Sequence, residues 1–303
     1  MTKSVFRSNR RPFQEDQERL GEVINWLSSH GKEPIGTRIA MYQKDLGRLV
    51  KAYSEGKLDE LLNKRDAETL LNSFLEARSL VLIHKGLKLI QGQDNALGQR
   101  IKDLLKGPEH SNQESSKTSS NQARNVSFEL VVAAYFAIAG YKIDLSTDAD
   151  LSIEDVNTML FVECKRPQSE NGIEPNINDA LKQLTRRYEE SNFNGEKRGL
   201  LALSISKIVN PEQRLLVAKD DQDLHTKMSN ILEKFIRKYE YLWAKPKDAR
   251  TLGIIVHLHT PAEVEGEDSY FTARNTGFSS ITVEGTPDDN YFCEIAGKLQ
   301  KAL

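Results

Sequence analysis

The chain of 303 residues carries 42 Lys and Arg against 44 Asp and Glu, a formal net charge of −2. This near-neutral total excludes a uniformly basic nucleic-acid coat protein. The length suits one large domain or two ordinary ones, and a hydrophobic content of 38% is enough for a packed core. We therefore expect a globular protein.

Two cysteines, Cys164 and Cys293, cannot form a disulfide framework, and no paired Cys/His spacing indicates structural zinc. We therefore expect a reducing, cytoplasmic setting. The basic N-terminus lacks the apolar core that is typical of a secretory signal. The longest apolar run, residues 130–139, has about half the length that a bilayer-spanning helix needs. We expect no membrane partner.

Residues 108–123 are mostly Ser, Asn, Gln and charged residues. Such a stretch cannot offset its ordering entropy by burial, so the sequence predicts a polar linker at 108–124. Residues 1–107 carry 19 basic and 14 acidic side chains, net +5, and the remaining residues carry 23 and 30, net −7. We therefore expect two parts of opposite charge, residues 1–107 and residues 125–303.

The pattern before the linker is helical. Apolar residues recur there at three- and four-residue steps: Leu20, Val23, Ile24 and Leu27; Leu46, Leu49, Val50 and Tyr53; Leu70, Leu71, Phe74 and Leu75. Little of strand character appears. Residues 1–107 therefore predict a small helical bundle or a set of helical arms, used for binding or oligomerisation.

Helix and strand patterns alternate after the linker. An almost wholly apolar helix at 128–139 ends before Gly140, the residue type that commonly follows a helix. Three short strands follow, at 141–145, 151–153 and 159–162. Further elements are a helix opened by Pro175, a strand at 198–206, a helix at 224–242, a strand at 252–259 and a helix at 288–303. This order predicts an α/β fold in which helices cover a mixed sheet.

Four ionisable residues fall where these elements could build a metal site. Glu129 is the only charge in the apolar helix, Asp150 opens the second strand, and Glu163 and Lys165 interrupt the third. Residues i and i+2 of a strand project from the same face, so Glu163 and Lys165 point together. A hairpin turn at 154–158 would place Asp150 opposite Glu163.

Two carboxylates at such a distance cannot both stay ionised in a poorly hydrated site unless a cation joins them. Oxygen ligands suit Mg²⁺ or Mn²⁺, which retain several waters and accept phosphate oxygens. The metal would activate water and polarise a phosphodiester, while Lys165 would position the nucleophile or offset charge in the transition state. The pattern indicates phosphodiester hydrolysis.

Three segments, FELVVAAYFAIAG, DADLSI and FVECKRP, at 128–140, 148–153 and 161–167, together resemble the PD-(D/E)XK, or restriction-endonuclease-like, nuclease superfamily. They match its first-helix Glu, second-strand Asp and third-strand ExK. The resemblance covers roughly residues 125–205 and implies an αβββαβ core with a mixed sheet. It also implies that Asp150 and Glu163 bind a divalent metal, with Glu129 in support, and that Lys165 assists hydrolysis of nucleic acid.

Several readings of these residues stay open. No proline precedes Asp150, and Asp148 lies on the same strand face as an alternative ligand. Glu129 would need no metal in the first turn of its helix, where the macrodipole favours a carboxylate. Glu163 and Lys165 could form a solvated edge pair of small energetic value.

Two other patterns contain residue types that are found in catalytic or metal sites. A second ExK triplet at 55–57 lies in a polar helical region without β-branched or aromatic neighbours. His257 and His259 share a strand face, but no third and fourth zinc ligands are obvious, so packing or hydrogen bonding is favoured.

Four basic residues near the motif are candidates for nucleic-acid binding. Arg166 follows the ExK directly. Lys182, Arg186 and Arg187 lie opposite the apolar stripe of the helix opened by Pro175 and could contact phosphates, although a charged helix face is usually just solvated.

The sequence thus favours a Mg²⁺- or Mn²⁺-dependent endonuclease that acts on DNA, with RNA left open. The resemblance and fold-level analogy imply a role in prokaryotic antiviral defence or restriction. Since the second part is net −7, we expect the +5 region, a second copy or a protein partner to supply the grip on nucleic acid. The alternative is a catalytically inactive nuclease-fold subunit that binds or assembles in a multi-protein complex.

Overall fold

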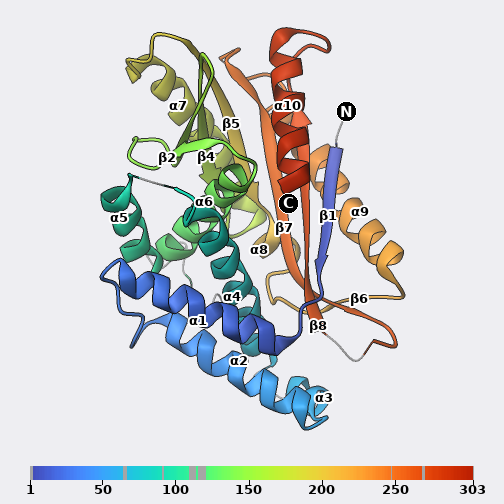
Figure 1. Ribbon diagram of the computed structural model, residues 1–303. Coiled ribbons are helices and arrows are strands. Elements are labelled where there is room, and N and C mark those ends of the chain that lie inside the picture. The colour runs from blue at the N-terminus through green and yellow to red at the C-terminus, as the bar shows by residue number, and fades with distance from the viewer. Residues whose placement is uncertain are drawn as a thin grey trace.

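One mixed eight-stranded sheet runs through the molecule and carries helices on both faces (Figure 1). The computed structural model describes residues 3–63, 67–90, 92–108, 114, 121–246, 248–267 and 270–302. The strands are β1 Lys3–Asn9, β2 Lys142–Asp144, β3 Leu151–Asp155, β4 Thr158–Lys165, β5 Glu196–Ser204, β6 Leu216–Ala218, β7 Thr251–Val264 and β8 Tyr270–Ser280. Their order is β1-β8-β7-β5-β4-β3-β2, and β6 pairs with β7 outside this path. The predicted α/β class with a mixed sheet is confirmed.

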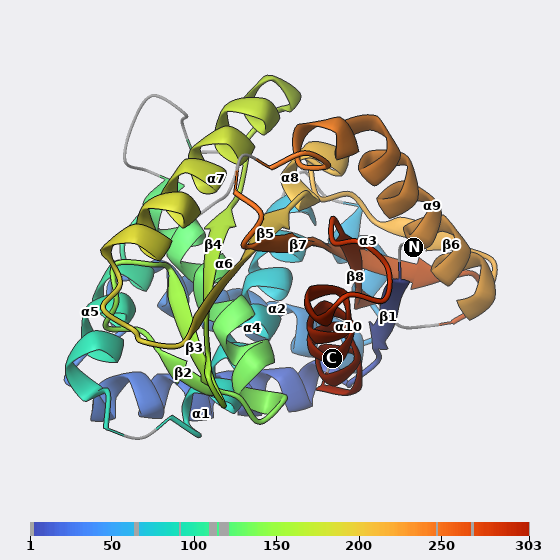
Figure 2. The ribbon, with the colours of Figure 1, turned by 90° about the horizontal axis from the view of Figure 1, so that it is seen from above.

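The helices form two layers around this sheet. They are α1 Phe13–Ser29, α2 Arg38–Ser54, α3 Leu58–Leu62, α4 Ala67–Leu87, α5 Asp94–Leu104, α6 Gln122–Ile138, α7 Ile173–Glu190, α8 Ser206–Val209, α9 Asp221–Tyr239 and α10 Pro287–Ala302. Figure 2 shows α7 and α9 on one side of the sheet and α6, α4 and α10 on the other. No helix in the described part of the chain is long and apolar enough to cross a membrane.

Strands β2, β3 and β4 form an antiparallel meander. Leu151 lies opposite Val162, and Asp155 opposite Thr158, so the turn falls within the predicted range 154–158. Val156 completes this turn with a φ of 47°, a left-handed conformation rare for a β-branched residue. Helix α7 then crosses the sheet to β5, which runs parallel to β4. The chain from α6 to β5 therefore follows the predicted order of one helix, three strands, one helix and one strand.

Helix α6 ends as its sequence predicts. Gly140 has a φ of 87°, and the N–H of Tyr141 donates to the carbonyl of Phe136 at 3.0 Å, which closes the helix in the Schellman manner. The helix begins at Gln122, earlier than its apolar run, so Glu129 lies in its middle and not in its first turn. Helix α7 begins two residues before Pro175, which occupies its first turn.

The expectation of a purely helical region at 1–107 missed β1. This strand pairs antiparallel with β8 and becomes an edge of the sheet. Its sequence, KSVFRSN, contains only two apolar residues, so its pattern is weak. Strands β6 and β8 were missed as well.

Both parts of the chain share one hydrophobic core. Leu20 and Tyr42 from the N-terminal helices belong to the same buried cluster as Phe136 and Leu160. Helix α4 crosses α6 so closely that a Cβ on Gly86 would lie 2.5 Å from the Cα of Ala134. The predicted linker lies largely outside the described residues, although its last residues, 122–124, belong to α6.

Candidate active site

The predicted site residues come from three adjoining elements. Glu129 projects from α6, Asp150 immediately precedes β3, and Glu163 and Lys165 lie near the end of β4. The hairpin register extends by one step beyond Leu151 and Val162 to place Asp150 beside Glu163. The backbone N–H of Cys164 donates to Oδ2 of Asp150 at 2.6 Å, which fixes this carboxylate against β4.

Glu163 is buried, Glu129 and Asp150 are partly buried, and the three carboxylates lie within electrostatic reach of one another. Burial, assisted by the charges of Asp150 and Glu163, raises the pKa of Glu129 to about 8. Burial, together with the charge of Asp150, raises the pKa of Glu163 to about 7. The pKa of Asp150 is raised by burial too, although its bond from Cys164 opposes the rise. A cation at this place would relieve the accumulated negative charge.

Two arginines partly balance these carboxylates. Arg100 of α5 forms an ion pair with Oε2 of Glu129 and donates to the carbonyl of Asp150 at 3.3 Å. Arg187 of α7 lies with its Nε 3.2 Å from Oε1 of Glu163. These contacts engage one oxygen of each glutamate, as the Cys164 bond engages one oxygen of Asp150.

The sequence interpretation of Arg187 was wrong, and Arg100 was missed. Arg187 is not on an exposed helix face, since its side chain is only 9% exposed. It follows Leu184 by three residues and therefore borders the buried stripe of α7, a spacing that could have indicated burial. No local signal marked Arg100, because its partner is 29 residues away.

Lys165 is held by α7. Its Nζ lies 2.7 Å from Oδ2 of Asp179 and 2.6 Å from Oε1 of Gln183, and its side chain is largely buried. An ammonium group restrained in this way has a defined position beside Asp150 and Glu163.

The other predicted nucleic-acid contacts are divided. Lys182 and Arg186 lie exposed on α7. Arg166 forms a bidentate ion pair with Glu114, in which Nη2 lies 3.0 Å from Oε2 and Nη1 lies 3.1 Å from Oε1. Lys207 approaches the same carboxylate to 3.1 Å, and the Glu114 side chain is fully buried.

The structure separates the alternatives that the sequence left open. The side chain of Asp148 is 90% exposed and its carboxylate lies 4.0 Å from Arg187, which donates to the Asp148 carbonyl, whereas the carboxylate of Asp150 is fixed against β4. The second ExK triplet forms a surface pair, in which Lys57 lies 3.0 Å from an exposed Glu55. Glu163, by contrast, is 1% exposed, so it is not part of a solvated edge pair.

The histidines pack as expected. His257 stacks on Phe128 with ring centroids 6.0 Å apart, and its Nδ1 lies 3.2 Å from the hydroxyl of Thr276.

The donor set suits a hard cation. In the described part of the chain, no group of three or more His, Cys, Asp or Glu side chains is arranged as a ready-made metal cage. Mg²⁺, however, usually takes only one or two carboxylates and keeps several waters. Asp150 and Glu163, adjacent and with one further oxygen each, meet that requirement.

No protein-family model, curated protein or solved structure was found to match the chain.

Proposed function

We propose that this protein is a Mg²⁺- or Mn²⁺-dependent nuclease of the PD-(D/E)XK type that hydrolyses phosphodiester bonds in DNA. The observation that carries the proposal is the meeting of Asp150 and Glu163 across the β3–β4 hairpin, with Lys165 on the same strand face and Glu129 beside them. Their sequence order is that of the motif, and the α6 to β5 order of elements is the one that the motif requires.

Each side chain has a defined task in this proposal. The metal, when bound, supplies charge stabilisation to the phosphodiester and activation of the attacking water. Asp150 and Glu163 would hold it, since each keeps one carboxylate oxygen outside the hydrogen bonds from Cys164 and Arg187. Lys165, oriented by Asp179 and Gln183, stabilises the negative charge that develops on the phosphate.

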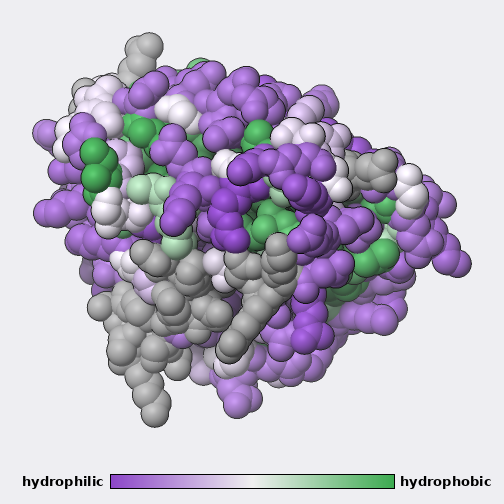
Figure 3. Space-filling model, turned by 90° about the horizontal axis from the view of Figure 1, so that it is seen from below, coloured by the Kyte–Doolittle hydropathy of each residue, from purple (hydrophilic) through white to green (hydrophobic). Residues whose placement is uncertain are grey.

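Several elements would contribute contacts with the DNA phosphates. Lys182 and Arg186 extend from α7 next to the site, and Arg166 directly follows the ExK motif. The surface at the end formed by α2 and α3 is mainly hydrophilic, with small and separate apolar groups (Figure 3). Contacts of this surface with phosphates or with a partner would therefore be mostly polar.

The proposal is tested by cleavage assays with matched variants. Linear, circular and single-stranded DNA, and RNA, are incubated with Mg²⁺, Mn²⁺ or EDTA. We expect metal-dependent cleavage of DNA that Glu163→Gln and Lys165→Ala reduce by about 10² or more. Glu55→Gln and Lys57→Ala, in the second ExK triplet, are the controls and retain full activity. Cleavage that survives both active-site changes would refute the assignment.

One observation favours the non-catalytic alternative. Arg100 and Arg187 pair with Glu129 and Glu163, so cationic side chains already stand where a metal would neutralise charge. A nuclease fold that has lost its metal could be stabilised in this way. Calorimetric titration with Mn²⁺ distinguishes the two functions, because a working site binds Mn²⁺ more tightly in the wild type than in Asp150→Ala. Equal binding, together with absence of cleavage, would establish the alternative.

A further inference from the structure

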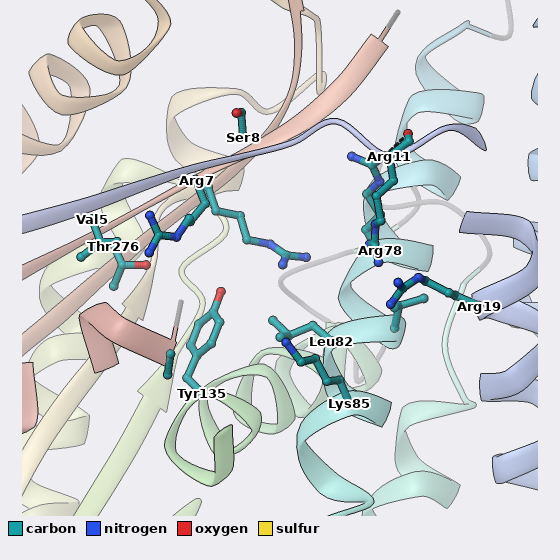
Figure 4. A pocket seen from close by; sticks show the side chains of 13 residues that line it. Val5, Arg7, Ser8, Arg11, Arg19, Arg78, Leu82, Lys85, Tyr135 and Thr276 are labelled. Carbon is teal, nitrogen blue, oxygen red and sulfur yellow. Dashed lines mark hydrogen bonds between the residues drawn. The ribbon is translucent and has the colours of Figure 1, made fainter. Parts of the chain in front are cut away.

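A pocket lies toward the opposite edge of the sheet from the β3–β4 hairpin, between strands β1 and β8 and helices α1, α4 and α6 (Figure 4). It is a pocket of about 350 Å³. Six of the residues that line it are basic: Arg7, Arg11, Arg19, Arg78, Lys85 and Arg274. No acidic residue belongs to the described lining. Its volume lies in the range of small-molecule sites.

The sheet itself brings like charges together here. Arg7 of β1 and Arg274 of β8 are direct cross-strand partners, and His259 of β7 is the next residue in the same row. Like charges directly opposite each other are unfavourable in a sheet. Arg7 and Arg274 therefore repel each other electrostatically, and an anion bound in the pocket would reduce this repulsion.

The pocket also contains hydrogen-bond donors without partners. The hydroxyl of Tyr135, the Nε of Arg11, and the Nε and Nη2 of Arg274 are buried and find no hydrogen-bond partner in the described structure. Tyr135 is only 5% exposed, and its hydroxyl points toward Arg7, across the pocket from Arg11, Arg19 and Arg78 (Figure 4). A guanidinium group has donors only. The missing partner is thus an acceptor, and an anionic oxygen suits it best.

Two carboxylates balance part of this charge. Asp16 accepts from Arg78 at 2.6 Å and lies 3.3 Å from Arg11, and Glu15 pairs with Arg19 at 2.7 Å. Burial still lowers the pKa of Arg78 to about 10, and the charges of Arg11 and Arg274 add to this effect. Within the described residues, Arg274 and Lys85 form no ion pair.

We propose that this pocket binds a small ligand with several phosphate groups, of the nucleoside polyphosphate class. The guanidinium group of arginine binds phosphate oxygens through bidentate hydrogen bonds, and a cluster of arginines can bind a polyphosphate chain in this way. Val5, Val81 and Leu82 line the same pocket and can pack against the organic part of such a ligand. Arg78 and Tyr135 lie too deep for the backbone of a duplex to reach them.

The described lining of the pocket contains none of the candidate nuclease residues. Strands β8, β7 and β5 lie between β1 and the β4–β3 hairpin that carries Asp150 and Glu163. Ligand binding can therefore be measured without any cleavage assay, and failure of one proposal leaves the other standing.

The test is equilibrium binding to the full chain in EDTA, which removes any metal from the carboxylates. ATP and tripolyphosphate should bind, and adenosine should bind at least about tenfold more weakly, because phosphate supplies the recognition. Added salt should weaken ATP binding, since the contacts are ionic. Arg274→Gln should weaken ATP binding by about tenfold or more, and Tyr135→Phe by several-fold. Arg237→Gln, an exposed arginine on α9, is the control and should bind ATP like the wild type.

We expect neither variant to lose binding through misfolding. Tyr135→Phe preserves the packed ring, and Arg274→Gln removes a like-charge pair, so both variants should keep the wild-type melting temperature or exceed it. Three results would each overturn the proposal: absence of ATP and tripolyphosphate binding, ATP binding that both variants leave unchanged, or adenosine binding as tight as that of ATP. Duplex DNA that binds through Arg274 where the small ligands do not would assign the pocket to nucleic acid and overturn it too.

Discussion

The Nε of Arg187 on α7 lies 3.2 Å from Oε1 of Glu163 on β4, and both side chains are almost completely buried. This contact ties the crossover helix to the strand that carries the ExK motif. It also opposes the rise in the pKa of Glu163 that burial causes. Arg187 is therefore a positioning residue of the candidate site.

We predict that Arg187→Gln lowers the free energy of unfolding by about 2–3 kcal/mol at pH 8, because it leaves a buried carboxylate without its cation. Urea denaturation measures this loss. Arg186→Gln is the matched control: its guanidinium is exposed and lies 3.6 Å from Glu190, so its loss should cost about 0.5 kcal/mol or less. Equal effects of the two changes would show that Arg187 contributes no more than a surface charge.

If this protein binds nucleic acid as proposed, Glu114 would compete with phosphate for Arg166. Its carboxylate forms a bidentate ion pair with the Arg166 guanidinium and also contacts Lys207. We predict that Glu114→Gln tightens binding of duplex DNA by several-fold, since Arg166, Lys207 and Arg124 lose a negative partner. Fluorescence anisotropy in EDTA with the Lys165→Ala background, in which cleavage is expected to be lowest, measures the affinity.

Glu233→Gln, on the exposed face of α9, is the control for the change in net charge. It should tighten binding less than Glu114→Gln does. DNA binding weakened by Glu114→Gln would show that this carboxylate supports the phosphate contact instead of competing with it.

The pH dependence of stability contains a specific contribution from His257. Burial, with a smaller effect of Arg274, lowers its pKa from 6.5 to about 3 in the folded protein. The unfolded chain therefore takes up the proton first as the pH falls. The stabilising contribution is complete above pH 6.5 and is lost progressively between pH 6.5 and about 3.

We predict that this residue accounts for a loss of about 2 kcal/mol of stability between pH 7 and pH 5. The measurement is the difference in that loss between the wild type and His257→Asn, obtained from urea denaturation at both pH values. Subtraction cancels the contribution of the buried carboxylates. The same loss in both proteins would mean that His257 is not held neutral by burial.

The close contact of α4 with α6 leads us to expect that the two parts of the chain unfold as one cooperative unit. We predict that Gly86→Ala costs about 2 kcal/mol, because the new methyl group would collide with the backbone of Ala134. Gly98→Ala on α5 meets no atom within 4 Å and should stabilise by about 0.5–1 kcal/mol through helix propensity. Differential scanning calorimetry measures both, and a second transition in Gly86→Ala would argue against one cooperative unit.

The local patterns of the sequence were reliable where a short stretch of chain determines the structure. The Gly140 helix end and the hairpin that sets Asp150 beside Glu163 depend on neighbours within a few residues or across a short turn. Backbone geometry and period-2 alternation are enough to specify both. For this reason the central motif could be placed before the fold was known.

The features that the sequence did not reveal depend on contacts between segments far apart in the chain. Arg100 and Arg187 reach Glu129 and Glu163 from helices 29 and 24 residues away, and no local pattern marks such a pair. Strand β1 has too few apolar residues to be recognised alone, and becomes a strand only because β8 offers it an open edge.

The basic pocket shows the same division most clearly. The sequence established that residues 1–107 carry a positive excess, but not where that charge gathers. Pairing of β1 with β8 sets Arg7 against Arg274, 267 positions apart, while α4 and α6 bring Arg78 and Tyr135 beneath them. Net charge is a property of composition, whereas its concentration in one pocket depends on which distant segments the hydrophobic core packs together.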